Sequence, residues 1–582
     1  MVDAILDPNG SYDIVGTSQG NPGRFFRADK NNIAPQFSIA YSPHANKGLL
    51  GTLLGDAKTT IRGGYRMSFV NDEYLKSALN AARGNAGLNV NVADVDAIPG
   101  GTTPNLNRRL RNITGGGFPA PVALTAPFTF FDANQADPNL FQTIFAVDPK
   151  MQVGSVHEFN VGIQRDLGWN TALEIRYVGG RSNNMIRSFD LNQIDIRSTG
   201  FIGDFLKAQR NFVLSGNVSG AYNPNIAGSQ PLPVFDQLPF GAFLDNSAIT
   251  THLINGTPAD LANIYIINGL DIDPSTGDGV QFRRNPFAGP VDLLSNMGKY
   301  RYDALQAEVR RRFSNGFSFQ ANYTFQKSLT DVPEDDQNRF DPLLDIENPQ
   351  WEYSRADFDR THTFNFNSIY QLPFGKGKTF LNKGGWVDAL FGGYQLTSIV
   401  TLSSGAPISI RDPRGTLNRV GRSPRQTALS NLTTAQIKEL IGIFRTPTGI
   451  FFINPAVIAA DGTATGGNLG ATPTAAFPGQ MFFNAQPGQT GNLPRAFING
   501  PKYINVDVGF AKNIHFGETM KLQLRAEAFN VFNRANFFAP TGVADGSTGE
   551  NSNIFNINST TFGRITGTYT PRILQFGVRF DF

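Results

Sequence analysis

The chain has 582 residues, and its composition favours a β-rich protein over a helical one. Glycine accounts for 61 residues and proline for 35, together more than the roughly 12% usual in globular proteins. Charged residues make up only 17% and the formal net charge is +3, which excludes a disordered polyelectrolyte and predicts no nucleic-acid partner. The chain has no cysteine, which excludes disulfides, thiolate catalysis and cysteine-bound metal clusters.

The sequence contains no stretch that approaches the ~18 consecutive apolar residues of a membrane helix, which excludes a helical integral membrane protein and leaves a membrane β-barrel open. The first 15 residues carry Asp3, Asp7 and Asp13, lack Lys and Arg, and have no sustained apolar core. They therefore lack the pattern of a secretory signal. We expect either a cytoplasmic chain or a chain whose signal lay in an upstream segment.

Alternation of apolar and polar residues with a period of two is the strongest pattern in the sequence. The clearest hairpin turns at Ser314-Asn315-Gly316, because Asn-Gly tolerates the positive φ angles of a tight β-turn. The segments approach the ~9 to 11 residues of a tilted membrane strand, which predicts apolar residues toward lipid and polar residues toward the lumen. We count roughly eleven predicted strands, within Gln36–Tyr41, Thr60–Phe69, Phe159–Ile163, Leu173–Tyr177, Ala304–Phe313, Phe317–Gln326, Phe364–Leu372, Tyr394–Leu402, Ile504–Phe510, Leu522–Ala528 and Leu574–Phe582.

The connections between these strands alternate between short and long. Short links follow Ile163 and Phe313, and a compact one covers Asn513–Thr519. This asymmetry is typical of bacterial outer-membrane barrels, which have short periplasmic turns and long extracellular loops. The long links are predicted at Val70–Gln152, Gly179–Tyr300, Leu329–Asp359, Ser404–Lys502 and Val531–Arg572.

Two short helices are predicted inside the long links. They cover Glu73–Ala82 and Thr433–Phe444, and Thr433 or Thr434 is the expected N-cap of the second.

The predicted fold class is all-β: an antiparallel transmembrane outer-membrane β-barrel, or a C-terminal portion of one, with long extracellular loops. Alternating Phe and Tyr also describe the core face of a soluble β-sandwich, but the strand lengths and the loop asymmetry favour the barrel. Bacterial single-chain barrels have even strand numbers. About eleven strands therefore predict that residues 1–582 form a single barrel region, a C-terminal fragment of a larger barrel, without a separate domain boundary.

Motifs that suggest chemistry have simpler explanations here, so no enzyme activity, cofactor or metal ion is predicted. The segment Gly16–Gly20 matches a nucleophile elbow without its strand and helix, and Gly377-Lys378-Thr379 ends like a phosphate-binding loop without its first glycine. Both are interpreted as turns. Isolated roles are expected for the five histidines, His44, His157, His252, His362 and His515. A solvated loop surface, with cation binding as the alternative, is expected for the acidic residues Asp331, Glu334, Asp335, Asp336, Asp341, Asp345 and Glu347.

Seven segments in chain order resemble the C-terminal barrel region of TonB-dependent outer-membrane transporters. The resemblance is to the large Oar-like group, which is often preceded by a carboxypeptidase-regulatory-like domain. The segments are NNIAPQFSIAYSP (Asn31–Pro43), TTIRGGYRMSF (Thr59–Phe69), HEFNVGIQRDLGWNTALEIRYVGGRS (His157–Ser182), FDRTHTFNFNSIYQLPFGKGK (Phe358–Lys378), GGYQLTSIVTLSSGAPISI (Gly392–Ile410), LRAEAFNVFNRANF (Leu524–Phe537) and FGRITGTYTPRILQFGVRFDF (Phe562–Phe582).

The resemblance implies the location, the partners and the role of the last strand. The chain is expected in the outer membrane of a Gram-negative-type bacterium, among outer-membrane lipid. The barrel assembly machinery is expected to recognise a terminal signal, which comprises Leu574, Phe576, Val578, Phe580 and Phe582. Family members also have an N-terminal plug inside a barrel of about 22 strands and a TonB-contacting box. Neither is recognised in this sequence, so contact with the TonB complex is expected only through a missing N-terminal segment.

The leading functional hypothesis is uptake of an unidentified nutrient by a TonB-dependent transporter-like barrel, truncated and uncoupled as given. In that mechanism, the long outer loops capture a small ligand and TonB-driven displacement of a plug admits it. One alternative is a passive porin or a surface-binding outer-membrane barrel. Another is a secreted β-rich carbohydrate-binding protein. The sequence does not identify the residues that contact the ligand.

Overall fold

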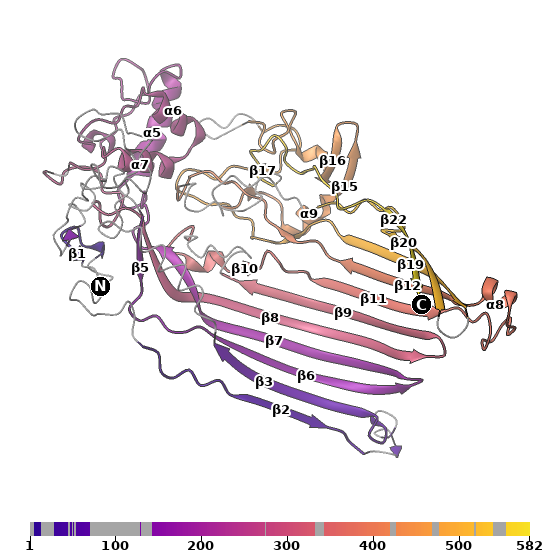
Figure 1. Ribbon diagram of the computed structural model, residues 1–582. Coiled ribbons are helices and arrows are strands. Elements are labelled where there is room, and N and C mark those ends of the chain that lie inside the picture. The colour runs from indigo at the N-terminus through magenta and orange to yellow at the C-terminus, as the bar shows by residue number, and fades with distance from the viewer. Residues whose placement is uncertain are drawn as a thin grey trace, which may run out of the picture.

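An antiparallel ladder of eleven long strands dominates the computed structural model (Figure 1). The structure describes residues 5–12, 28–44, 47–48, 51, 54–69, 128–129, 143–273, 275–331, 343–419, 426–467, 476–516, 520–538 and 555–582. The ladder strands lie side by side in chain order. They are β2 (Gln36–Tyr41), β3 (Thr59–Phe69), β6 (Ser155–Gly168), β7 (Thr171–Asp190), β8 (Val291–Ser314), β9 (Phe317–Thr330), β11 (His362–Gln371), β12 (Tyr394–Ser403), β19 (Tyr503–Phe516), β20 (Met520–Phe529) and β22 (Ile573–Asp581).

Each of the roughly eleven predicted strands is confirmed. The pairing register places apolar residues of one strand opposite mainly apolar residues of the next, and polar residues opposite polar ones. Leu305 lies opposite Phe325, which lies opposite His362 on the next strand. On the other face, Gln306 lies opposite both Arg176 and Thr324. Because side chains alternate between the faces of a strand, one face of the ladder is mainly apolar and the other mainly polar.

The apolar face is not covered by protein. Phe576 and Val578 on β22 expose 78% and 74% of their surface, far more than a soluble sheet would leave in water. This face therefore requires an apolar solvent, as the barrel prediction demands.

The two ends of the ladder differ in the size of their connections. Trp169-Asn170 joins β6 to β7 and Asn315-Gly316 joins β8 to β9, and all four residues have positive φ, as the tightest β-hairpin turns require. The connections of 191–290 and 404–502 lie at the opposite end, where they form packed bodies (Figure 1). The predicted asymmetry of the links is thus confirmed.

The remaining elements lie mostly in these connections. The helices are α5 (Phe201–Leu214), α6 (Ser247–Asn255), α7 (Pro258–Ile267), α8 (Trp386–Phe391) and α9 (Thr434–Glu439), with short 3-10 turns η4 (Phe235–Gln237), η5 (Pro349–Glu352) and η6 (Pro455–Val457). The short strands are β1 (Ser11–Tyr12), β4 (Phe128–Thr129), β5 (Ile144–Val147), β10 (Ser354–Arg355), β13 (Pro407–Ile408), β14 (Leu429–Ser430), β15 (Ile441–Thr446), β16 (Gly449–Ile453), β17 (Phe482–Phe483), β18 (Ile498–Asn499) and β21 (Arg564–Ile565). In the described part of the chain, no helix has the length and hydropathy to cross a bilayer.

Several predicted boundaries are wrong. The link predicted at Gly179–Tyr300 is shorter, because β7 and β8 continue to Asp190 and from Val291. Register shifts after Ser182 break the period of two there and hide the strands from the sequence pattern. The helix predicted to end at Phe444 ends at Glu439, because the following residues pair as β15. Its N-cap is Thr433, one of the two predicted candidates. The helix predicted at Glu73–Ala82 lies outside the described residues.

The ladder ends in two open edges. Within the described residues, β2 pairs only with β3 and β22 pairs only with β20. Eleven antiparallel strands make ten pairings, so β2 and β22 run in the same direction. Antiparallel closure therefore needs an odd number of further strands between them.

The two faces predict opposite responses to a new charge. Phe366 lies on the apolar face opposite Ala321, and its neighbour Asn367 lies on the polar face opposite Gln320. Phe366→Arg should reduce the yield of folded, membrane-inserted protein, because a lipid-facing Arg near the bilayer midplane costs about 2–4 kcal/mol. Asn367→Arg should insert like the parent. Heat-modifiable electrophoretic mobility measures folding, and equal folded yields for the two variants would contradict this assignment of the faces.

Candidate functional site

The polar face of the ladder provides a hydrogen-bonding lining that crosses several strands. Arg66 contacts Glu158, and Arg176 donates from Nε to Gln306 Oε1 at 2.6 Å. Shallow hollows lie on this face where β3 and β6–β9 meet, lined by Arg62, Asn160, Gln164, Glu174, Arg176, Gln306, Glu308, Asn322 and Thr324. Amides, hydroxyls and paired charges of this kind suit the passage of a polar solute.

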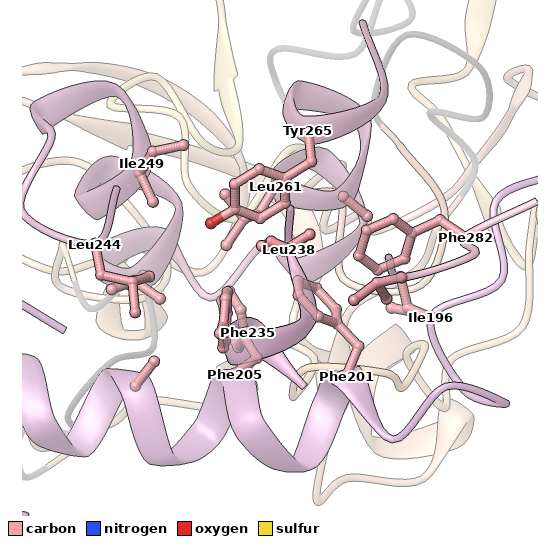
Figure 2. Close-up of a cluster of buried hydrophobic side chains, with 14 of the residues drawn as sticks. Ile196, Phe201, Phe205, Phe235, Leu238, Leu244, Ile249, Leu261, Tyr265 and Phe282 are labelled. Carbon is pink, nitrogen blue, oxygen red and sulfur yellow. The ribbon is translucent and has the colours of Figure 1, made fainter. Parts of the chain in front are cut away.

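Above this lining, the link 191–290 forms a helical loop body with its own hydrophobic core. Phe201, Phe205 and Phe212 of α5 are buried, and Phe201 meets the ring of Phe282 edge-on at 4.8 Å. Figure 2 shows Phe201, Phe205 and Phe282 converging with Tyr265 of α7. Tyr265 is fully buried, its hydroxyl donates to the carbonyl of Ala242 at 2.7 Å, and burial raises the pKa of this hydroxyl. The link therefore has a packed, preformed structure.

The second loop body comprises residues 404–419, 426–467, 476–502 and 555–565. Its core includes Ile410, Ile453, Phe482 and Phe562, all with no solvent exposure. Asp412 is fully buried and accepts hydrogen bonds from Arg414, at 2.8 Å from both Nε and Nη2, and from the backbone N–H of Ala485. Segments distant in sequence are thus fixed to one another.

The two bodies touch through hydrogen bonds to backbone carbonyls and through two glycines that lie close to side chains. The amide of Ala259 at the start of α7 donates to the carbonyl of Gly415 at 3.0 Å, and Arg414 Nη1 donates to the carbonyl of Asn255 at 2.6 Å. A Cβ at Gly415 would lie 2.3 Å from the Asp260 carboxyl carbon, and one at Gly488 would lie 2.3 Å from Ile202 Cδ1. Both glycines therefore lie against side chains of the helical loop body, and the φ of 76° at Gly488 favours glycine there.

A third segment, 343–361, is pinned to both bodies. Arg197 of the helical loop body donates to both carboxyl oxygens of Asp345, at 2.8 and 2.9 Å. Burial acts to raise the pKa of Asp345, but hydrogen bonds from Arg197 and Asn348 outweigh it and hold this pKa below its usual value. On the other side, Arg355 donates from Nη1 to Asn499 at 2.8 Å.

A buried charge cluster lies where this segment, the top of β7 and the second loop body meet. Glu352 lies between two guanidinium groups: Arg495 Nη1 at 2.7 Å and Arg187 Nη2 at 3.7 Å from its carboxylate. The side chains of Arg187 and Glu352 are only 2% exposed and that of Arg495 is 10% exposed. Loss of the carboxylate would leave buried positive charge, which is much more costly than loss of an exposed pair.

The five residues of the predicted terminal signal lie on β22 or directly after it. Leu574, Phe576, Val578 and Phe580 lie on the apolar face of β22, and Phe582 directly follows the strand. All five are exposed. Their predicted role in assembly stays a prediction.

The glycine-rich motifs and the histidines, for which no chemistry is predicted, lie in turns or form isolated contacts. Gly377 has a φ of 75° in a turn, as predicted, and Gly16–Gly20 lies outside the described residues. Described histidines bond to separate partners, for example His157 to Tyr65 and His252 to Thr257. Among the described residues, no group of three or more His, Cys, Asp and Glu could hold a metal ion.

The interpretation of the acidic stretch as a solvated surface is wrong for Asp345. Its side chain is 1% exposed, whereas that of Glu347 is 63% exposed. The reason is the bidentate contact with Arg197, a residue 148 positions away that no local pattern reveals. Glu334, Asp335, Asp336 and Asp341 lie outside the described residues.

The helical loop body is the main feature that the sequence analysis missed. A usable pattern exists: Phe201, Phe205, Ala208 and Phe212 recur at helical spacing and are all buried, which is the periodicity of an amphipathic helix. The Gly-, Pro- and Asn-rich flanks directed the interpretation toward an irregular loop.

Glu352→Ala should loosen this end of the molecule, because it leaves Arg187 and Arg495 buried without their shared carboxylate, at a local cost of roughly 3–5 kcal/mol. Amide hydrogen exchange should rise in residues 343–361 and around Arg495, with the ladder unchanged. Glu347→Ala on the same segment removes an exposed contact and is the matched control. Equal exchange in the two variants would contradict a stabilising role for the cluster.

Comparison with known proteins identifies the class of the fold. The family described as "Outer membrane beta barrel domain" matches residues 2–575. No curated protein matches in a sequence search. Similar solved structures include the outer membrane transporter YddB from Escherichia coli (7% identity, TM-score 0.37, covering 95% of this chain and 41% of that one).

Two further structures have comparable similarity. One is the ferripyoverdine receptor of the outer membrane of Pseudomonas aeruginosa (8% identity, TM-score 0.32, 94% of this chain and 33% of that one). The other is the siderophore receptor PiuA from Acinetobacter baumannii (8% identity, TM-score 0.31, 94% of this chain and 35% of that one). The chain thus spans less than half the length of these three structures. Since the family match extends over almost all of the sequence, the chain belongs to the outer membrane beta barrel domain family and is an antiparallel barrel protein of the outer membrane.

Proposed function

We propose that this chain is the barrel region of an Oar-like, TonB-dependent transporter that imports an unidentified nutrient across the outer membrane. The observation that carries the proposal is the stacking of two packed loop bodies at one end of a continuous polar sheet face. Loops with buried cores present a fixed surface to a ligand. Binding to such a surface does not cost the conformational entropy of ordering the loops, because they are already ordered in the folded protein. The seven resembling segments between Asn31 and Phe582 support the assignment to this transporter group.

In this mechanism, a ligand binds among the outer loop bodies and then passes along the polar lining. Energised passage would depend on a plug and a TonB-contacting segment in addition to the described ladder. The chain itself contributes capture, through its long connections, and a hydrogen-bonding path, through residues such as Asn160, Arg176 and Gln306.

The barrel is proposed to close with an odd number of further strands supplied by the same protein. Unpaired backbone groups in hydrocarbon cost several kcal/mol each, so the edges at β2 and β22 need partners. The end of β22 is proposed to direct assembly, because a strand with free edge groups and exposed Phe576, Phe580 and Phe582 offers both pairing and apolar contact to the assembly machinery.

Depletion of nutrients from a defined medium tests the function even though the ligand is unidentified. Mass spectrometry would follow each component in cultures of the natural host, with and without the gene and with and without TonB. Removal of the gene or of TonB should slow the depletion of at least one compound. Removal of both together should slow it no further. Dependence on the gene but not on TonB would indicate a passive porin and contradict the proposal.

Proteolysis of intact cells tests the orientation. Protease added outside should cleave a site engineered after Gly241, an exposed turn of the helical loop body with a φ of 93°. The same site inserted between Asn315 and Gly316 should be protected until the outer membrane is permeabilised. The reverse pattern would place the loop bodies in the periplasm.

A further inference from the structure

The polar face of the ladder contains a sector without charged side chains. It comprises every second residue of Ser318–Gln326 on β9, Thr363–Gln371 on β11 and Gln395–Ser403 on β12, and we name these residues the uncharged sector. The structure describes these three strands in full, and their polar-face positions hold only amides, hydroxyls and two isoleucines.

The strands on both sides of the uncharged sector carry charges on the same face. Glu308 on β8 lies opposite the sector's first strand, and Arg525 lies on β20. On β19, which pairs with β12, the carboxylate of Asp507 is held by protein donors. It accepts from Asn505 Nδ2 at 2.9 Å and from the backbone N–H of Asn530 at 2.8 Å. The absence of charge is therefore a local property of the sector and not of the whole face.

The uncharged sector is amphipathic as well as neutral. Ile369 and Ile399 are 42% and 55% exposed although they occupy polar-face positions. Ile369 lies opposite Thr397, and Ile399 lies opposite Asn367. Asn365 and Asn367 are also exposed. A solute on this surface thus meets apolar groups beside groups that both donate and accept hydrogen bonds.

Exposed aromatic rings lie at the loop end of the uncharged sector. Tyr503 begins β19 opposite Ser403, and its ring meets that of Tyr569 edge-on at 5.1 Å. The ring of Phe538 lies 4.6 Å from that of Tyr569, and these two residues are 40% and 45% exposed. The carbonyl of Asn536 accepts from the backbone N–H of Tyr569 at 2.8 Å and fixes its position. We name Tyr503, Phe538 and Tyr569 the aromatic platform.

From this arrangement, we propose that the ligand is an uncharged oligosaccharide, which stacks on the aromatic platform and then passes along the uncharged sector. Sugar hydroxyls donate and accept hydrogen bonds, as do the amides and hydroxyls of the sector. The C–H face of a sugar ring is apolar and packs against exposed aromatic rings. An ionic solute would lose hydration on a surface without a compensating charge, which is costly. The inference rests on the proposed transport function and names the class of its substrate.

Ligand binding to the full-length protein, purified in neutral detergent from the outer membrane of its natural host, tests the proposal. The probes are an array of neutral oligosaccharides and uronic-acid oligosaccharides, with ferric citrate and an end-blocked neutral peptide as rival ligand classes. Thermophoresis measures each affinity. At least one neutral oligosaccharide should bind, at least about tenfold more tightly than the uronic-acid oligosaccharide of equal length. Binding of no neutral oligosaccharide, or tighter binding of any rival class, would overturn the proposal.

Variants of the aromatic platform test where the oligosaccharide binds. Tyr569→Ala should weaken its binding about tenfold, whereas Tyr569→Phe keeps the ring and should stay within about twofold of the parent. Trp386→Ala is the control, because it removes a ring that is 74% exposed on α8, at the short-turn end of the ladder (Figure 1). Heat-modifiable mobility checks the folding of each variant. Equal affinities of Tyr569→Ala and Trp386→Ala would contradict stacking on the platform.

Uptake of the bound oligosaccharide by whole cells tests the uncharged sector. Asn365→Leu/Asn367→Leu keeps side-chain bulk but removes hydrogen-bonding groups, so uptake should slow at least about threefold while the affinity of the purified protein stays unchanged. Unchanged uptake would contradict passage along the sector.

The binding measurement also separates this inference from the proposed function, because it involves neither TonB nor uptake. If no neutral oligosaccharide binds while nutrient depletion still depends on the gene and on TonB, the inference fails and the transport function stands. If an oligosaccharide binds but no depletion depends on TonB, the proposed transport function fails instead.

Discussion

The pairing of backbone polar groups in hydrocarbon is the constraint on which the rest of this structure depends. A bilayer offers no water to an unpaired N–H or C=O, so a strand can cross it only inside a closed ladder. The eleven strands satisfy each other in chain order. The two-residue turns after β6 and β8 lie at one end, and the longest connections, 191–290 and 404–502, lie at the other. Loop asymmetry, alternation of side chains and the demand for further strands at β2 and β22 all follow from that condition.

The same constraint separates the hydrophobic residues into two groups with different solvents. Apolar ladder residues such as Phe576 and Val578 are exposed because lipid is their intended environment. Conventional protein cores lie instead in the connections, around Phe201 and Tyr265 in the helical loop body and around Phe482 and Phe562 in the second. Stability of the loop bodies therefore comes from packing and buried charge pairs, whereas stability of the ladder comes from hydrogen bonds and lipid.

The ladder could be predicted from sequence because its rule is local. A period of two persists wherever one face meets lipid and the other meets a polar lumen, so strands such as β9 and β11 were readable residue by residue. The pattern ends at Tyr177, because Gly179 and Gly180 have no side chains to continue it, and beyond Ser182 register shifts also break the alternation. The junctions of the candidate site could not be found in this way, because Arg197–Asp345 and Glu352–Arg495 join residues more than 140 positions apart. The apolar residues of helix α5 recur at helical spacing, but the Gly-, Pro- and Asn-rich flanks of the helix resemble a loop.

Spin-label accessibility along β9 tests the central claim, that one parity of the ladder faces lipid and the other a watery lumen. The chain contains no cysteine, so single cysteines at 319–324 can each be labelled without background in protein reconstituted into membranes. Collision with oxygen, which concentrates in lipid, should peak at Phe319, Ala321 and Tyr323. Collision with a water-soluble nickel chelate should peak at Gln320, Asn322 and Thr324. Equal access of both reagents to all six positions would contradict the account.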